Sequence, residues 1–323
     1  MTAYLDFERP IAELEREIAD LEGLRDKGEG SAGLDIDEEI GRLKAKAAAL
    51  VAATYRDLSP WQKTLVARHP ARPRCRDLIA NLLSEFVPLA GDRAYGEDPA
   101  IVGGLARFRG QSVVLLGHER GSDTASRIKH NFGMAKPEGY RKAQRLMRLA
   151  DCFGLPLLTL VDTPGAYPGI DAEARGQAEA IARTIALSLE LSVPVVACIV
   201  GEGGSGGAVA LATADRVLML EHSVYSVISP EGCAAILWRA PERAPDAAEA
   251  LRLTAQDLLR LGVIDTVVPE PLGGAHRQPA QLYPLLGDAL EQAIVALAGQ
   301  PGHDRGANRR AKFLAMGRAL SGE

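Results

Sequence analysis

The heptad GEGGSGG at residues 201–207 constrains the fold of this chain more than any other feature. Five glycines in seven residues are entropically costly to order, so bare backbone must meet a specific requirement there. The apolar run VPVVACIV at 193–200 has the length of a buried strand, and AVALATA at 208–214 has a helix pattern. The heptad therefore predicts a strand-to-helix junction at which the backbone approaches another group closely.

Strand and helix patterns alternate along much of the chain. AIVGGLARF at 100–108 and QSVVLLGHE at 111–119 predict a hairpin joined at Arg109-Gly110. Continuous apolar strands between helices predict an α/β domain with a largely parallel sheet covered on both faces. Further expected elements are a helix over 137–154, a strand over 155–162, a helix over 172–191, strands over 216–221 and 223–228, helices over 231–238 and 246–261, a strand over 263–269 and a helix over 280–298.

Three regions differ in composition and in hydrophobic pattern, and they define the expected domains. Residues 1–58 show two amphipathic helix patterns separated by DKGEGSAGLDID, in which Asp35 or Asp37 would cap the second helix. We interpret this region as a helical hairpin that forms an N-terminal arm. Residues 59–300 form the main domain, which opens with a proline-interrupted, linker-like stretch at 61–77. Residues 301–323 are a basic, partly irregular tail.

Composition excludes several classes of function. A net charge of −5 gives no sign of a nucleic-acid footprint. The longest apolar runs fall far short of the ~20 residues that span a bilayer, and the polar start does not resemble a signal peptide. We therefore expect a cytoplasmic protein that binds neither nucleic acid nor membrane. The cysteines lie far apart without a CxxC pair, so neither disulfides nor a zinc site is expected; they are Cys75, Cys152, Cys198 and Cys233.

Two known motifs fit the heptad. Gly201, Gly203 and Gly206 match the dinucleotide fingerprint G-x-G-x-x-G, and Glu221 follows at the distance of a ribose-binding acid. The helix after the heptad is short for that unit, however.

The second motif is the nucleophile elbow G-x-S-x-G of serine hydrolases. Ser205 would be the nucleophile, and Asp265 and His276 follow in the chain order that the fold requires. Order along the chain does not show that the three side chains meet.

A third interpretation uses the glycines themselves. The loops DTPGAYPG at 162–169 and GEGGSGG at 201–207 each follow a buried strand. In parallel sheets, binding sites form at the carboxyl ends of the strands, and unpaired amides at a helix start favour negative charge. Since no Walker lysine follows, an oxyanion that develops during a reaction is a better ligand than nucleotide phosphate.

At these loops the chain resembles the bacterial family of acetyl-coenzyme A carboxylase carboxyltransferase α subunits. The resemblance covers nearly the whole chain up to about residue 300, apart from the linker at 24–34. It is carried by LDFERPIAELE (5–15), IDEEI (36–40), LAGDRAY (89–95), AIVGG (100–104), NFGMAKPEGYRKA (131–143), DTPGAYPG (162–169), RGQAEAIA (175–182), GEGGSGGA (201–208), YSVISPEGCA (225–234) and PEPLGGAHR (269–277).

The resemblance implies an α/β fold with a crotonase-like (ClpP/crotonase) core. It implies transfer of a carboxyl group from carboxybiotin to acetyl-coenzyme A, giving malonyl-coenzyme A for fatty-acid synthesis. The family's oxyanion glycines fall on Gly206 and Gly207, with Gly165 and Ala166 in the opposing loop. Residues expected to border the biotin cofactor are Gly203, Gly204, Ser205 and Tyr167.

The resemblance also implies partners. In the family, a β subunit mainly holds the acyl-coenzyme A, and the α subunit mainly faces carboxybiotin. We therefore expect an α2β2 assembly, in which the N-terminal hairpin is a candidate contact region. Biotin carboxyl carrier protein, biotin carboxylase and zinc belong to other chains, so no metal is expected in this one.

Overall fold

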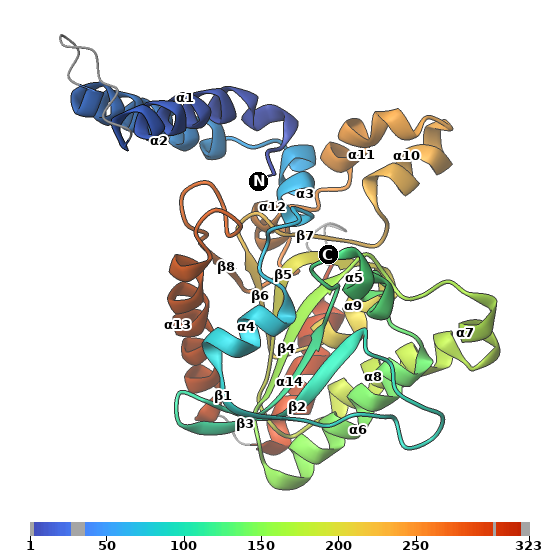
Figure 1. The fold of residues 1–323 in the computed structure, drawn as a ribbon. Coiled ribbons are helices and arrows are strands. Elements are labelled where there is room, and N and C mark those ends of the chain that lie inside the picture. Colours follow the sequence, from blue (N-terminus) through green and yellow to red (C-terminus); the bar gives the residue numbers. More distant parts are fainter. Residues whose placement is uncertain (1–2, 27–35, 300–301, 318–323) are drawn as a thin grey trace.

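The computed structural model describes residues 3–26, 36–299 and 302–317. Strands and helices alternate as the sequence predicts (Figure 1). The strands are β1 (Ser84–Pro88), β2 (Ile101–Phe108), β3 (Gln111–His118), β4 (Leu157–Thr163), β5 (Val195–Gly204), β6 (Arg216–Leu220), β7 (Val224–Ser226) and β8 (Thr266–Val268). The α-helices are α1 (Arg9–Asp26), α2 (Ile36–Arg56), α3 (Pro60–Ala67), α4 (Cys75–Leu82), α5 (Thr124–Lys129), α6 (Pro137–Phe153), α7 (Ile170–Ala174), α8 (Gln177–Glu190), α9 (Ser205–Ala212), α10 (Pro230–Trp238), α11 (Ala244–Ala250), α12 (Ala255–Arg260), α13 (Pro279–Ala298) and α14 (Gly302–Ala315). Single 3₁₀ turns are η1 (Asp6–Glu8), η2 (Asn131–Gly133) and η3 (Pro241–Arg243).

One mixed sheet organises the chain. Its order is β1-β2-β3-β4-β5-β6-β8, and β7 pairs with the end of β5. The first three strands are antiparallel and the rest are parallel. The predicted hairpin is confirmed: Arg109 and Gly110 join β2 to β3 with φ of 47° and 83°, the left-handed pair that a tight hairpin turn needs.

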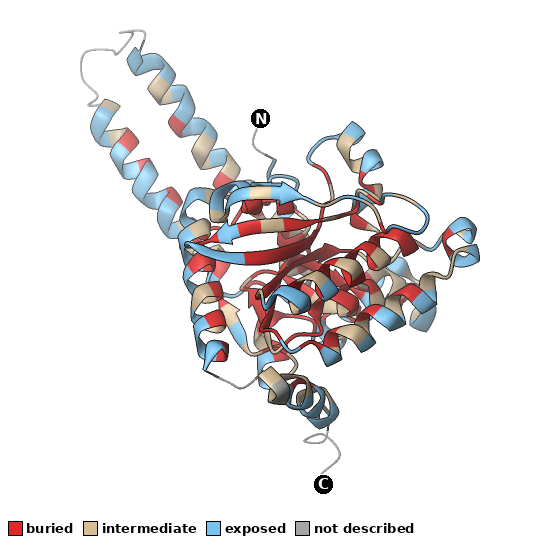
Figure 2. Cartoon of the chain, turned by 90° about the horizontal axis from the view of Figure 1, so that it is seen from below, coloured by how far each residue is buried: buried red, intermediate tan, exposed pale blue. Residues whose placement is uncertain are grey.

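Two hydrophobic cores lie on the two faces of the sheet. Helices α6, α8 and α9 cover one face, where Leu146, Met147 and Leu211 pack on the strands. Helices α4 and α13 cover the other face through Leu78, Leu286 and their neighbours. The central strands are accordingly buried along their length (Figure 2). A sheet buried on both faces explains why these strands read as continuous apolar runs.

The predicted N-terminal hairpin is present as α1 and α2, which project from the body of the molecule (Figure 1). Along much of their length the two helices pack on each other, through Ile18, Leu43 and their apolar neighbours. Of the two expected capping residues, Asp37 lies inside the first turn of α2 and Asp35 lies outside the described residues. The domain limits at 58 and 300 remain predictions.

Several expected boundaries are wrong because local patterns did not show where helices break. The helix expected over 172–191 is divided into α7 and α8 at Gly176, whose φ is 81°. The helix expected over 246–261 is likewise divided into α11 and α12. The linker-like stretch at 61–77 contains most of α3 and the start of α4, because its two prolines, Pro70 and Pro73, lie between the helices and interrupt neither.

The tail, which was expected to be partly irregular, is helical over Gly302–Ala315. Helix α14 packs against α8, and Arg309 on it is buried. The guanidinium of Arg309 pairs with Asp215 at 2.7 Å and donates to the carbonyls of Leu191 and Val193. These carbonyls lie just beyond the end of α8, so Arg309 helps to fasten the C-terminal helix to the body, as does Lys312 through its pair with Asp265. Within the described residues, no helix is long and apolar enough to cross a membrane.

Replacing Arg309 with methionine should lower the free energy of unfolding by about 3 to 5 kcal/mol, because the Asp215 carboxylate, whose side chain is only 6% exposed, loses its charged partner. Arg310 is the matched control, since it is the next residue of the same helix and is exposed. Arg310→Met should change stability by less than about 0.5 kcal/mol in urea titrations. Equal effects of the two substitutions would contradict the role given to Arg309.

Stability should also fall as the pH drops below about 6.5, because burial lowers the pKa of four histidines. Burial lowers the pKa of His118 to about 4 and that of His276 to about 3, and the pKa values of His69 and His222 are lowered as well. The unfolded chain then binds more protons than the folded chain below about pH 6.5. Urea titrations should give a loss of more than about 1.4 kcal/mol per pH unit between pH 6 and pH 5. A free energy of unfolding that stays flat over this interval would contradict the burial of these rings.

Candidate active site

The two glycine-rich loops meet at one edge of the sheet. Strands β4 and β5 are parallel neighbours, and their pairing continues to Thr163 and Gly203, at the carboxyl ends of both strands. The first loop leaves β4 toward α7, and the second leads directly into α9. The sequence therefore brings the two loops together as expected.

Bare backbone at the heptad lets the two loops touch. A Cβ on Gly204 would lie 2.2 Å from the Pro164 carbonyl oxygen, and a Cβ on Gly207 would lie 2.7 Å from the Ala166 nitrogen. Real Cβ atoms do not approach backbone that closely, so both positions exclude any other residue without moving the opposing loop. Gly206 is different, because its Cβ would meet nothing nearer than Ile181 at 3.6 Å.

The loop after β4 is held by the buried side chain of Thr163. Its hydroxyl accepts from the Gly165 amide at 3.0 Å and donates to the Gly165 carbonyl at 2.7 Å. Gly165 itself has φ of 149°, which a side chain would strain. The Gly165 carbonyl and the Ala166 amide belong to one peptide unit, so Thr163 fixes the direction of the Ala166 N–H.

The start of α9 offers further amide donors. Gly204 occupies the N-cap position, and no side chain caps the helix there. The first amides of a helix have no partner within it and lie at the positive end of its dipole. Ser205, the first residue of α9, has φ of 56° and an exposed side chain, whereas Gly206 is half-buried.

An apolar cleft of about 290 Å³ borders the start of α9. The first turns of α9, the end of β7 and α12 surround it, so it opens beside the amides of the heptad. Its lining residues are Ser205, Val209, Tyr225, Ser226, Val227, Leu251, Leu258 and Val263.

The expected site residue Tyr167 does not line this cleft. Its ring packs against Gly169 and under the Lys136 ammonium, which lies 4.9 Å from the ring centre. Its amide donates to the Ala135 carbonyl at 3.0 Å. Tyr167 therefore supports the loop after β4, and a role beside the biotin remains a prediction.

The position at which β5 ends excludes the dinucleotide-binding interpretation. Strand β5 runs to Gly204, so Gly201 and Gly203 lie inside the strand and do not form a turn. Gly201 makes room for the carboxylate of Asp162, which a Cβ at that position would meet at 2.5 Å. The carboxylate of Glu221 is engaged by the Glu270 amide at 3.1 Å.

The hydrolase interpretation fails because the three residues are not assembled. Ser205 has the strained left-handed φ of a nucleophile elbow. Asp265, however, accepts from the Val217 amide and pairs with Lys312, and the His276 ring stacks on His69 at the base of the N-terminal arm. Within the described residues, no hydrogen bond joins Ser205, Asp265 and His276.

A buried charge network supports the heptad, and the sequence analysis missed it. Asp162 accepts from the Glu202 amide at 3.0 Å and pairs with Arg120 at 3.1 Å. Arg120 also pairs with Glu202, whose carboxylate pairs with Arg68. Burial alone would raise the pKa of Asp162, but Arg120 and Arg74 hold it below its usual value. The arginine-rich stretch at 67–77, read as a linker, was the available signal.

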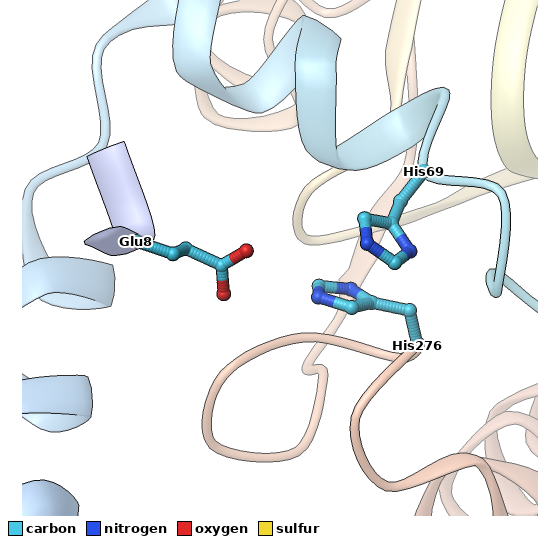
Figure 3. A group of neighbouring side chains, drawn as sticks. All are labelled: Glu8, His69 and His276. Carbon is cyan, nitrogen blue, oxygen red and sulfur yellow. The ribbon is translucent and has the colours of Figure 1, made fainter. Parts of the chain in front are cut away.

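A second cluster, shown in Figure 3, lies where the arm meets the body. Ligand atoms of Glu8, His69 and His276 lie within 4.8 Å of one another. The Glu8 carboxylate already accepts from the Tyr55 hydroxyl at 2.9 Å and pairs with Arg277. His69 accepts from the Ala71 amide through Nδ1 and so donates to the Ala3 carbonyl through Nε2. Protein partners and a nearby guanidinium make this a poor cation site, and we assign no metal to it.

The chain matches known proteins over nearly its whole length. The family described as "acetyl co-enzyme A carboxylase carboxyltransferase-like" matches residues 4–317. The acetyl-coenzyme A carboxylase carboxyl transferase subunit alpha of Paramagnetospirillum magneticum is 61% identical, with 98% of each chain covered. The protein of the same name from Erythrobacter litoralis is 61% identical over 98% of this chain and 100% of its own length.

Solved structures share the fold at lower identity. The 12S transcarboxylase, solved with methylmalonyl-coenzyme A, aligns at a TM-score of 0.56 and 23% identity over 69% of this chain and 42% of its own. A Pseudomonas malonate decarboxylase tetramer, solved with coenzyme A, aligns at 0.54 and 20% over 69% of this chain and 90% of its own. These likenesses confirm the crotonase-like α/β fold.

The glycines of the heptad should differ sharply in their tolerance of alanine. Gly204→Ala should lower the free energy of unfolding by more than about 2 kcal/mol, because its Cβ overlaps the Pro164 carbonyl. Gly206→Ala has space and favours the helix, so it should leave stability unchanged or raise it slightly. Urea titrations of both variants test the contact, and equal tolerance at the two positions would contradict it.

Proposed function

The chain belongs to the family of acetyl-coenzyme A carboxylase carboxyltransferase α subunits, and we propose that its two glycine-rich loops carry the transfer. The reaction moves a carboxyl group from carboxybiotin to acetyl-coenzyme A and yields malonyl-coenzyme A. The site residues proposed for it are Gly206 and Gly207 at the start of α9 and Gly165 and Ala166 after β4.

The amides at the start of α9 suit an oxygen that gains negative charge. Release of the carboxyl group leaves charge on the ureido oxygen of the biotin ring. Amide donors that are already oriented stabilise such an oxygen by about 3 kcal/mol each, and they need no change of protonation. The observation that carries this proposal is the close contact of the uncapped α9 start with the Thr163-fixed loop.

The apolar cleft beside α9 is the proposed place for the biotin ring system. Its walls, formed by residues such as Val209, Tyr225 and Leu258, match the apolar faces of a bicyclic ring. Ser205 lies at the mouth of the cleft and acts there as a small neighbour of the ring, without a nucleophilic role. Gly203 and Gly204 hold the strand end behind it.

The partner that completes the site is proposed to be a carboxyltransferase β subunit in an α2β2 assembly. Large apolar side chains stay exposed beside the cleft: Val227, Ile236 and Leu237 are 77%, 73% and 62% exposed. We propose that these side chains belong to an apolar surface that the β subunit covers. The carboxybiotin would arrive on a separate carrier protein, which biotin carboxylase loads.

Gly206→Val tests the oxyanion assignment directly. A Cβ at this position would meet nothing nearer than Ile181 at 3.6 Å, so the variant should fold. We expect its branched side chain to obstruct the approach of an oxyanion to the proposed donors. With the β subunit reconstituted, kcat for malonyl-coenzyme A formation should fall about 100-fold or more. A folded variant with unchanged turnover would rule out the proposed donors.

Ser205→Ala is the companion variant that separates the two chemistries. Carboxyl transfer should persist within about threefold, because the hydroxyl takes no part in the reaction. Loss of all transfer together with loss of an esterase activity would instead restore the hydrolase interpretation.

A further inference from the structure

Tyr140 on α6 lies beneath the two loops of the site. A Cβ on Gly207 would lie 2.7 Å from the Tyr140 hydroxyl and also 2.7 Å from the Ala166 nitrogen. The same point lies 2.9 Å from the carbonyl carbon of Gly165. The hydroxyl therefore reaches the place where the start of α9 touches the loop after β4.

The hydroxyl is buried and has no hydrogen-bond partner among the described residues. Tyr140 is fully buried in the core between the sheet and α8, and that burial raises its pKa. A buried hydroxyl without a partner costs about 1 to 3 kcal/mol, whereas phenylalanine would fill the same space without that cost. Groups of this kind in a folded protein call for an explanation in function.

The Gly165 peptide takes part in the same contact, since its carbonyl carbon would lie 2.9 Å from a Cβ on Gly207. The Gly165 carbonyl accepts from Thr163 at 2.7 Å and has a second lone pair. It belongs to the peptide unit that carries the Ala166 N–H, one of the proposed oxyanion donors. A second hydrogen bond to this carbonyl polarises the peptide and makes the Ala166 N–H a stronger donor.

We propose that Tyr140 is a positioning residue for carboxyl transfer, whose hydroxyl donates to the Gly165 carbonyl when an oxyanion is bound at the loops. Catalytic hydrogen bonds are often absent or long in unliganded proteins and tighten in the complex. Tyr140 and Thr163 then act on the same peptide unit, and neither touches the substrate. This inference rests on the proposed function of the loops.

Tyr140→Phe should lower kcat without lowering the midpoint of thermal unfolding, measured on the α chain reconstituted with its β subunit. The midpoint of thermal unfolding should stay the same or rise, because an unpartnered hydroxyl is removed. The kcat for malonyl-coenzyme A formation should fall about tenfold, the effect of one ordinary hydrogen bond, while KM for both substrates stays within about twofold. Unchanged kcat with a raised midpoint would overturn the proposal.

Tyr55→Phe is the matched control. Tyr55 is also buried, but its hydroxyl donates to Glu8 at 2.9 Å, at the base of the arm. Its loss should lower the unfolding midpoint and leave kcat unchanged. The two tyrosines should therefore show opposite patterns.

A double-mutant cycle tests whether Tyr140 works through the Gly165 peptide. Thr163→Val removes the observed hydrogen bond to that carbonyl. If both hydroxyls act on one peptide unit, the fold-losses in kcat of Tyr140→Phe and Thr163→Val should not multiply in the double variant. Independent, multiplying effects would refute this route.

The Gly206→Val variant distinguishes a failure of the proposed oxyanion function from a failure of the role proposed for Tyr140. If Gly206→Val leaves turnover intact, the oxyanion function fails. If Gly206→Val abolishes turnover while Tyr140→Phe has the kcat of the unmodified protein, only the role of Tyr140 fails.

Discussion

The close approach of two main chains at the carboxyl ends of β4 and β5 is the constraint on which this structure depends. Gly204 and Gly207 press against Pro164 and Ala166 without side chains between them. Such contact costs conformational entropy at each glycine, and it places amides from two loops side by side. Three of the five glycines in the heptad thus meet two different steric needs. Gly201 accommodates a buried carboxylate, whereas Gly204 and Gly207 accommodate backbone.

The rigidity of this contact depends on polar groups that lie deeper in the fold. Asp162 and Glu202 lie within the strands next to the loops and are held by Arg120 and Arg68. Buried ion pairs contribute little net stability compared with apolar packing. We infer that these ion pairs specify the register of the strand ends, because each carboxylate has a fixed set of donors that only one register satisfies. The charge network and the Thr163 hydroxyl thus fix β5 and the neighbouring loop.

The parts of the fold that depend on local rules could be predicted from the sequence. Pro137 and Gly154 set the limits of α6, and Arg109-Gly110 sets the β2–β3 turn. The rest depends on contacts between distant segments. Nothing near residue 309 indicates that its guanidinium meets Asp215, and nothing in the heptad shows that β5 continues to Gly204. The chain order of Ser205, Asp265 and His276 suggested a triad, but these side chains belong to separate clusters of the fold.

The proposed donors differ from most catalytic groups in that they do not titrate. Amides of Gly206, Gly207 and Ala166 are donors at every pH at which the chain is folded, and no ionisable side chain of the loops takes part in the proposed reaction. The buried histidines with lowered pKa lie elsewhere: His276 is at the base of the arm, and His118 lies near Asp162. We therefore expect acid to act on this subunit through folding, whereas the proposed chemistry of its loops depends on main-chain geometry. Backbone donors from two chains can act on one ligand without any adjustment of side-chain pKa values. This property suits a subunit that acts together with other subunits.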